Sequence, residues 1–478
     1  MEFDLNKPWC HYFHAISMIP RGSCNEKAVS DYVVNFAKER GLAWQQDEVS
    51  NVIIEKPATP GYEDAPVMVL QAHLDMVPAK EKDSAHDWSK DPLDLYVEDG
   101  LLKARGTTLG ADDGTGVAYM LALLDSSDIP HPALQCFFTT MEEIGLVGAL
   151  KLRPGCVKGT RMINLDGGGI NHCGLSCAGG ANGILTKELS WTLNEAPTYK
   201  AVVRGLEGGH SAGAISKEKA NATMTLARIL KETELKGCDI GLVSINGGEV
   251  DNAIPREAEA CFVSSAPQEE LFAAMEESEK AIWAELEFSD AGFELVKEPV
   301  KKAALKIDPK QSQEILDLLF VLPNGFQHKS MAIEGLTTVS QNLGITKTTQ
   351  KKLTLNSLMR SAFESANDHN IARLATLAKA YGFDFEVGMR YPGWAYQAES
   401  ELREIYANVV REKLGEELVT SAGHGGNECG VFAALKPGID IVTFGPISRY
   451  IHTPQEELDL ESFDKAWEVL TAILEASK

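Results

Sequence analysis

The sequence lacks the features that mark membrane-spanning and secreted proteins. It contains no run of 18 or more apolar residues, which is about the length that a helix needs to cross a bilayer. The first residues, from Met1 to Lys7, show no basic segment followed by an apolar stretch, so we expect no secretory signal. These absences favour a cytoplasmic protein with no membrane partner.

Cysteine is scarce and irregularly placed. The nine cysteines are an odd number spread over 478 residues, which argues against a disulfide framework and for a reducing compartment. Cys173 and Cys177 lie beside His172 and could be taken for a zinc clip. Their spacing is off the usual two-residue pattern and no second pair follows, so buried structural thiols are the favoured interpretation.

Basic residues are also under-represented. The chain has 45 Lys and Arg against 69 Asp and Glu, a formal charge of −24. Such a chain repels phosphate backbones and anionic lipids, so we expect no nucleic-acid partner. The content of 44% hydrophobic and 24% charged residues is ordinary for a globular protein, and the length suits two or three domains.

One apolar segment ends in two residues that can bind or orient a metal ion. Val67 to Leu70 are apolar in succession, which is typical of a strand buried on both faces of a parallel sheet. The segment leads to His73 and Asp75, and strand side chains two residues apart point the same way. Open α/β sheets bind ligands at the carboxyl ends of their strands, so this pair is a candidate half of a metal site. A satisfied surface pair is the alternative.

A glycine-rich segment, 105–116, contains the next acids, Asp112 and Asp113. A helix over 117–124 is predicted to follow. The segment has no Gly-Lys-Ser/Thr, and two carboxylates would face a phosphate, so a phosphate loop is excluded. Acidic side chains at a tight turn suit a cation better.

Acids and a second histidine recur at later strand ends. Glu142 and Glu143 follow a predicted strand over 134–140, where neighbouring side chains point in opposite directions. Asp166 closes a short apolar strand, and His452 lies just past another. One such ending arises easily by chance. Four successive predicted strands, however, end in ligand-type side chains, at 73/75, 112, 142/143 and 166, which favours a metal site.

The pattern of predicted elements changes twice along the chain. Strands and helices alternate up to residue 187 and again from 393, which predicts an α/β fold with a mixed, mostly parallel sheet flanked by helices. Residues 188–392 instead favour an inserted α+β domain with an antiparallel sheet. Segments 243–263 and 339–359 resemble one another, so we expect this insert to have two similar halves. The expected divisions are 1–187, 188–392 and 393–478.

The order of these motifs resembles that of a known enzyme family. The motifs are His73-x-Asp75, Gly110-Ala111-Asp112-Asp113, Glu142-Glu143, Asp166, Gly208-Gly209-His210-Ser211 and His452. They resemble the aminoacylase and carboxypeptidase family of two-zinc metallopeptidases over essentially the whole chain. Within that family, three segments look most like those of the aminoacyl-histidine dipeptidases. They are residues 109–114 (Leu-Gly-Ala-Asp-Asp-Gly), 208–213 (Gly-Gly-His-Ser-Ala-Gly) and 427–432 (Asn-Glu-Cys-Gly-Val-Phe). The outer segments would then form the catalytic domain and the insert a lid.

The resemblance implies a set of metal ligands. Asp112 would bridge two metal ions, His73 and Asp166 would hold one of them, and Glu143 and His452 the other. Alignment on the preceding Gly-Ala favours Asp112 over Asp113 as the bridge, and this choice stays open. The ions would be Zn²⁺, with Co²⁺ or Mn²⁺ as alternatives, because histidine and carboxylate ligands suit all three.

Other roles follow from the same resemblance. Glu142 would be the general base, and Asp75 would orient His73. From the lid, His210 would polarise the scissile carbonyl. A hinge near residues 187 and 392 would then couple lid closure to the chemistry.

Substrate contacts are implied as well. Asn252 and Arg360 resemble residues that bind the substrate carboxylate, and Glu428 is a candidate for its α-amine. The resemblance predicts a metal-dependent dipeptidase of broad specificity, with Xaa-His peptides as one favoured class. A tripeptidase or N-acyl amino-acid deacylase is the main alternative, and an inactive binding relative is another. A homodimer is compatible with the family.

Overall fold

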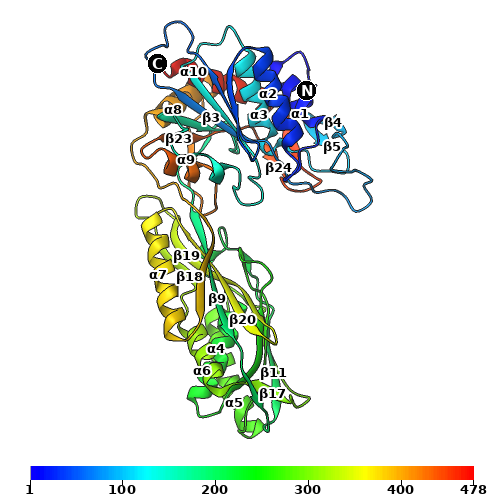
Figure 1. The fold of residues 1–478 in the computed structure, drawn as a ribbon, viewed down its shortest axis with the longest axis vertical. Coiled ribbons are helices and arrows are strands. Elements are labelled where there is room, and N and C mark those ends of the chain that lie inside the picture. Colours follow the sequence, from blue (N-terminus) through cyan, green and yellow to red (C-terminus); the bar gives the residue numbers. More distant parts are fainter. Residues whose placement is uncertain (1) are drawn as a thin grey trace. The chain divides into compact units, whose positions relative to one another are not determined.

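The chain forms two compact units, and the computed structural model describes residues 2–478 (Figure 1). The first unit contains the chain up to Cys177 together with Trp394–Ala422 and Asn427–Lys478. The second contains Ala178–Gly393 and Gly423–Gly426. Among residues 2–478 we find no helix with the length and apolar character that a bilayer-spanning segment requires.

A six-stranded sheet forms the centre of the first unit. Four neighbouring strands, β6, β3, β7 and β23, are parallel to one another. On the other side of β6, strands β2 and β1 extend the sheet in antiparallel pairing. This arrangement confirms the predicted mixed, mostly parallel sheet. In spatial order the strands are β1 (Ala43–Gln46), β2 (Val52–Lys56), β6 (Leu134–Thr139), β3 (Met68–His73), β7 (Arg161–Asn164) and β23 (Asp440–Thr443).

Helices bury both faces of this sheet. All six residues of β3 are buried, as its apolar sequence predicts. On β6, the successive residues Phe137 and Phe138 are both fully buried although they point to opposite faces. Phe137 packs edge-on against Phe432 of α9, with ring centroids 5.0 Å apart. The helices of this unit are α1 (Pro8–Ser17), α2 (Lys27–Glu39), α3 (Ala111–Asp125), α8 (Glu401–Leu414), α9 (Cys429–Leu435) and α10 (Leu460–Ala476).

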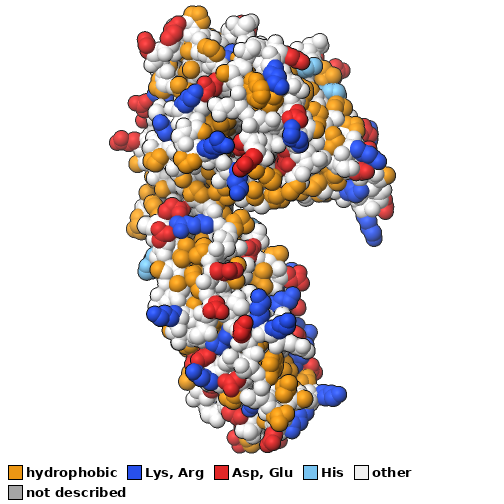
Figure 2. Space-filling view, in the orientation of Figure 1, with side chains coloured by type: hydrophobic (Ala, Val, Ile, Leu, Met, Phe, Trp, Pro, Cys, Tyr) orange, Lys and Arg blue, Asp and Glu red, His pale blue; other side chains and the backbone are white. Residues whose placement is uncertain are grey.

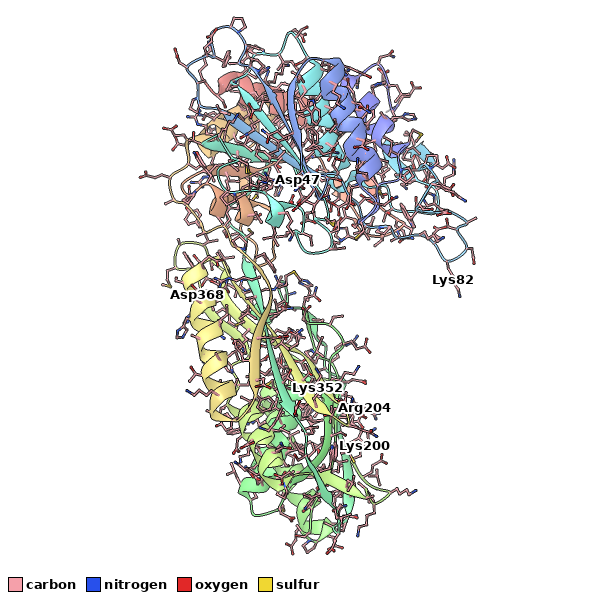
Figure 3. All side chains as sticks on the ribbon, viewed as in Figure 1. Asp47, Lys82, Lys200, Arg204, Lys352 and Asp368 are labelled. Atoms are coloured by element: carbon pink, nitrogen blue, oxygen red, sulfur yellow. The ribbon has the colours of Figure 1, made fainter. Side chains whose placement is uncertain are left out.

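Two smaller sheets complete the first unit. A four-stranded sheet has the order β24 (Ser448–Arg449), β25 (Glu457–Asp459), β5 (Leu101–Ala104) and β4 (Leu95–Glu98). A parallel pair joins β8 (His172–Gly174) to β22 (Val419–Ser421). Between β3 and β4 the chain makes a polar excursion, and Lys82 lies in its projecting loop (Figure 3). Strand β25 of the four-stranded sheet begins at Glu457, shortly after the predicted ligand His452.

The second unit is built on a nine-stranded antiparallel sheet. Eight strands follow the order β16 (Glu294–Val300), β11 (Thr198–Arg204), β15 (Ala258–Val263), β13 (Gly241–Gly247), β19 (Thr337–Thr348), β20 (Lys352–Ser361), β9 (Gly179–Glu188) and β21 (Asp384–Tyr391). The ninth, β18 (Gly325–Lys329), pairs with β19. Short pairs join β10 (Trp191–Leu193) to β17 (Leu305–Ile307) and β12 (Gly209–His210) to β14 (Ala253–Ile254).

Alternation along β11 shows how this sheet is covered. Tyr199, Ala201 and Val203 are buried against the helices, whereas Lys200 and Arg204 lie on the open face (Figure 3). These two exposed residues pair across strands with Glu259 at 2.7 Å and Glu294 at 2.9 Å. The covering helices are α4 (Ala222–Leu235), α5 (Gln268–Leu286), α6 (Pro309–Val321) and α7 (Glu364–Ala380).

The two predicted halves of the insert are visible in the strand order. The first half runs β11, α4, β13, β15, α5 and β16, and the second runs β9, α6, β19, β20, α7 and β21. Corresponding strands occupy mirrored places in the sheet, and β13 meets β19 at its centre. The sequence echo therefore reflects a repeated supersecondary unit.

Some sequence-based boundaries were displaced. The division between units falls between Cys177 and Ala178 rather than at residue 187, because β9 pairs along its length with β20 in the second unit. Helix α3 begins at Ala111, earlier than expected, with non-helical backbone at Asp112 and Asp113.

Candidate metal centre

Three parallel strands of the first unit deliver most of the predicted ligands to one edge of the sheet. His73 is the last residue of β3, Glu142 and Glu143 follow β6, and Asp166 lies two residues after β7. Because β6, β3 and β7 are adjacent and parallel, their carboxyl ends meet. Asp112 departs from the predicted pattern, since it comes from the first turn of α3 rather than from a strand end.

The carboxylate of Asp112 lies between two histidines from distant parts of the chain. Its Oδ1 is 3.0 Å from Nε2 of His73, and its Oδ2 is 3.2 Å from Nε2 of His452. His452 Nε2 also lies 3.1 Å from Oε2 of Glu143, and His73 Nε2 lies 3.9 Å from Oδ1 of Asp166. All five predicted metal ligands thus belong to one continuous cluster.

Ligand-type atoms in this cluster fall into three overlapping groups. Within each group, one atom per residue lies within 4.8 Å of the others. The groups are His73, Asp113 and Asp166; His73, Glu142 and Glu143; and Asp112, Glu143 and His452. Glu142 and Glu143 were predicted to point in opposite directions, but both offer an oxygen to one group. The reason is that β6 ends at Thr139, so strand alternation no longer applies to them.

The chemistry of the cluster fits divalent cations. Oε1 of Glu143 is buried and has no hydrogen-bond partner among residues 2–478, which is a costly state for a carboxylate oxygen. Imidazole nitrogens and carboxylate oxygens are ligands of Zn²⁺, Mn²⁺ and Co²⁺ alike. His73, Asp112, Glu143, Asp166 and His452 could therefore hold such ions.

The acids and imidazoles perturb one another strongly. Burial raises the pKa of Asp166 well above its ordinary value, and the negative charge of Asp112 adds to this shift. Burial alone would raise the pKa of Asp112, but hydrogen bonds with His452 and His73 hold it below its usual range. Hydrogen bonds with Asp112 and Glu143 raise the pKa of His452 to about 10. The cluster thus contains more negative charge than its two imidazoles can balance.

Asp75 contacts the residues that carry the cluster. It is fully buried, and its Oδ1 lies 3.5 Å from Nδ1 of His73. Its two oxygens also accept the backbone N–H groups of Glu142 at 3.0 Å and Glu143 at 3.3 Å, and Ser23 donates to it at 2.9 Å. Asp75 therefore ties the end of β3 to the turn after β6.

Asp113 has a different environment from its neighbour Asp112. It is buried, and its oxygens accept the backbone N–H of Gly116 at 3.1 Å and of His73 at 3.3 Å. Between the two aspartates, only Asp112 has one oxygen at each histidine. This geometry supports Asp112 as the bridging residue.

Two further glutamates of the first unit have raised pKa values. Burial raises the pKa of Glu142 to about 7, despite the opposing effect of His73. Glu428, at the N-cap of α9, is fully buried and accepts hydrogen bonds from Gln71 and, at 2.8 Å, from Thr139. Its other oxygen, Oε1, is buried and has no hydrogen-bond partner among residues 2–478. The contact of Glu428 with a substrate amine stays a prediction.

The three residues predicted to act from the insert come together within the second unit. His210 of β12 pairs in register with Ala253 of β14, next to Asn252. The carbonyl of Asn252 accepts the N–H of Ser211 at 2.7 Å, and Nε of Arg360 donates to Oγ of Ser211 at 3.2 Å. Ser211 is thus the shared neighbour of all three.

Arg360 is a buried cation with neutral partners. Only 4% of its surface is exposed, and Nη1 donates to Oη of Tyr391 at 2.9 Å. No carboxylate forms an ion pair with it among residues 2–478. The positive charge of Arg360 also acts on His424. Nε2 of His424 forms a hydrogen bond of 2.7 Å with Oγ of Ser340. Burial, together with the charge of Arg360, lowers the pKa of His424 to about 4. His424 is not among the residues that the sequence motifs single out.

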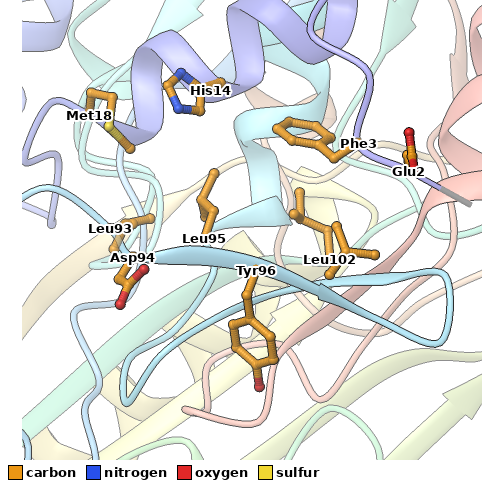
Figure 4. Close-up of a pocket in the computed structure, with 10 residues that line it drawn as sticks. Glu2, Phe3, His14, Met18, Leu93, Asp94, Leu95, Tyr96 and Leu102 are labelled. Atoms are coloured by element: carbon orange, nitrogen blue, oxygen red, sulfur yellow. The ribbon is translucent and has the colours of Figure 1, made fainter.

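A separate cavity in the first unit lacks this chemistry. It has a volume of about 670 Å³ and lies between α1 and the β4–β5 hairpin (Figure 4). Phe3, Leu95 and Leu102 supply apolar surface there, and none of the clustered acids lines it. The cavity is therefore distinct from the candidate metal centre.

The fold and the acid-rich centre together define a metallopeptidase. The family model of Peptidase family M20/M25/M40 matches residues 69–476, and the chain belongs to this family. This membership confirms the predicted resemblance.

Individual relatives match along almost the full length. The chain is 34% identical over 477 residues to the cytosol non-specific dipeptidase of Escherichia coli (strain K12), covering 98% of this chain and 97% of that protein. The crystal structure of aminoacylhistidine dipeptidase from Vibrio alginolyticus superposes with a TM-score of 0.91 at 33% identity, covering 98% and 96% of the two chains. Aminopeptidase PepT from Bacillus cereus ATCC 10987 covers 100% of both chains with a TM-score of 0.56 at 16% identity, which shows a shared fold alone.

Proposed function

We propose that this chain is a dipeptidase that uses two divalent cations, most simply Zn²⁺, to hydrolyse dipeptides of broad sequence, including Xaa-His. The observation that carries this proposal is the position of Asp112 between His73 and His452. A carboxylate with one oxygen at each of two imidazoles is suited to bridge two ions. The names of the two nearly full-length relatives support the choice of dipeptides as substrates.

The roles of the chain's own residues follow from their positions. Divalent cations supply Lewis acidity to water and to the scissile carbonyl, which amide hydrolysis needs at neutral pH. Glu142 accepts the proton of the attacking water and returns it to the leaving amine. Its raised pKa suits this exchange, since a general base works best when its pKa lies near the operating pH. Asp75 holds His73 in the orientation that presents Nε2 to the site.

The second unit supplies substrate contacts in this proposal. Arg360 binds the substrate carboxylate, because it is a buried guanidinium with no acidic partner among the described residues. Asn252 assists it, and His210 donates to the oxygen of the scissile carbonyl. Burial and the charge of Arg360 lower the pKa of His210, so its imidazole is neutral at physiological pH and can donate one N–H.

A direct assay tests the proposal. The purified chain is stripped with a chelator and assayed on Ala-His, on N-acetyl-Ala-His and on a tripeptide, before and after addition of Zn²⁺, Co²⁺ or Mn²⁺. Hydrolysis of Ala-His alone, restored by metal, supports the dipeptidase. Preference for the acetylated peptide indicates a deacylase, and preference for the longer peptide indicates a tripeptidase. Activity that survives exhaustive chelation contradicts the metal centre.

The cellular location and the oligomeric state of the enzyme stay predictions. A cytoplasmic location agrees with the nine free cysteines and with the name of the Escherichia coli relative. Homodimer formation is testable by sedimentation velocity on the purified chain.

A further inference from the structure

A buried carboxylate outside the predicted ligand set holds the turn that carries Asp112. Glu456 is 2% exposed and lies four residues after His452. Its Oε2 accepts the N–H groups of Leu109 and Gly110, each at 2.8 Å. Its Oε1 accepts the N–H groups of Ala111 at 2.8 Å and Asp112 at 3.4 Å. Four consecutive backbone donors are thus satisfied by one side chain.

These donors lie at a helix start that cannot cap itself. The first N–H groups of an α-helix have no partner within the helix, and a side chain at the N-cap usually accepts one of them. The N-cap of α3 is Gly110, which has no side chain and a φ of 68°. A Cβ at this position would lie 2.6 Å from Nη2 of Arg21 and 2.7 Å from the sulfur of Met76. The cap must therefore come from elsewhere in the chain.

Arg21 fixes the carbonyl side of the same turn. It is 1% exposed, and it donates to the carbonyl of Gly110 and to those of Leu74 and Asp75, both at 3.1 Å. The end of β3 and the start of α3 are thereby joined through one guanidinium. Arg21 and Glu456 are also close enough for their opposite charges to act on each other. Together they hold both the donors and the acceptors of the turn that bears Asp112.

We propose that Glu456 is a positioning residue that couples the two cation positions of this enzyme. The segment containing it also contains His452, so its hydrogen bonds fix His452 relative to Asp112. With both held, Oδ2 of Asp112 faces His452 while Oδ1 faces His73. The inference rests on the proposed function, because it presupposes that cations bind at this cluster. Loss of Glu456 lowers the affinity for metal without removing any ligand atom.

The test compares metal binding by Glu456→Gln and by the unaltered chain. Glutamine keeps the size of the side chain but turns an NH₂ group toward two backbone donors, so about half of the accepted hydrogen bonds are lost. Glu461→Gln is the matched control, since it removes a nearby charge from an exposed side chain that pairs with Lys465. Each protein is stripped of metal and titrated with Zn²⁺ by isothermal calorimetry. Amide hydrogen exchange is followed at residues 109–112.

We expect two sites in the unaltered chain and in Glu461→Gln. In Glu456→Gln, the affinity of at least one site should fall about 10–100-fold, as for other residues that orient metal ligands. Exchange at the amides of 109–112 should be faster in the same variant. Unchanged affinity in a folded Glu456→Gln would overturn the inference. Absence of any metal binding by the unaltered chain would instead refute the proposed function.

A second variant covers the case in which Glu456→Gln does not fold. Glu456→Asp keeps both acceptor oxygens but withdraws them by one methylene, so a smaller loss of affinity is expected with circular dichroism unchanged. Metal affinity within twofold of the unaltered chain, with unchanged exchange at 109–112, would also contradict the role of Glu456.

Discussion

The two units differ most in the sign of the charge that they bury. The first unit concentrates carboxylates near the ends of β3, β6 and β7, where they outnumber the nearby cationic groups His73, His452 and Arg21. The second buries Arg360 among neutral partners. On the surface in Figure 2, acidic and basic side chains are instead interspersed over both units. We therefore expect buried, uncompensated charge to indicate the ligand of each unit: a cation for the first unit and an anion for the second.

The units also hold their functional residues by different means. In the first, buried carboxylates accept backbone N–H groups and so fix the turns that carry ligands, as Asp75 does for Glu142 and Glu143. In the second, short strand pairing and neutral hydrogen bonds around Ser211 position the polar side chains. We therefore expect substitutions in the first unit to change the chemical step or metal binding, and substitutions in the second unit to change the interaction with substrate.

The largest effect is expected for Glu142→Gln. Removing the general base should lower kcat by about 10²–10⁴-fold, because proton transfer then depends on water alone. Metal content, measured by mass spectrometry of the desalted protein, should stay at two ions. A parallel loss of metal would place Glu142 among the ligands and remove it from its role as base.

The next largest effect is expected for His210→Ala in the second unit. Loss of one donor to the developing oxyanion typically lowers kcat by about 10²–10³-fold. His369→Ala, an exposed histidine of α7, is the control and should behave as the unaltered chain. Steady-state kinetics on Ala-His with both variants checks this, and an unchanged kcat for His210→Ala would end its assignment to the carbonyl.

A smaller effect is expected for Arg360→Lys. Lysine keeps the charge but loses the planar pair of donors, so a loss of about 10–100-fold in kcat/KM is expected, mostly through KM. Arg390→Lys is the control, since Arg390 is surface-exposed and pairs with Glu364 at 2.6 Å and with Asp368 at 2.7 Å. Equal losses in the two variants would show that Arg360 has no special relation to substrate.

The smallest effect is a change in the pH dependence of stability in Glu428→Gln. Burial, reinforced by the charge of Glu142, raises the pKa of Glu428 from 4.5 to about 8 in the folded protein. Its stabilising contribution is thus complete below pH 4.5 and is lost as pH rises through about 8. Glutamine stays neutral, so the Tm of the metal-free variant relative to the unaltered protein should increase from pH 5 to pH 9. A difference that does not depend on pH would contradict the shift.

Much of the architecture was predictable from local patterns. The apolar run before His73 identified a buried strand, and acids after successive strands indicated one sheet edge, because parallel strands end together. The echo between 243–263 and 339–359 correctly indicated two similar halves. In these cases the residues that form each pattern lie close together along the chain, so the pattern can be recognised in the sequence.

The supporting residues could not be found in this way. Glu456 accepts N–H groups of residues about 345 positions away, and a bond from a side chain to a distant backbone leaves no periodic trace. Arg21 is similar, and as an isolated arginine it would ordinarily be placed at the surface.

The most direct test of the account is anomalous diffraction from crystals grown with Zn²⁺, collected on both sides of the zinc absorption edge. Two anomalous peaks are expected, one within ligand distance of His73, Asp112 and Asp166 and the other within ligand distance of Asp112, Glu143 and His452. A single peak, or peaks that do not share Asp112, would contradict it.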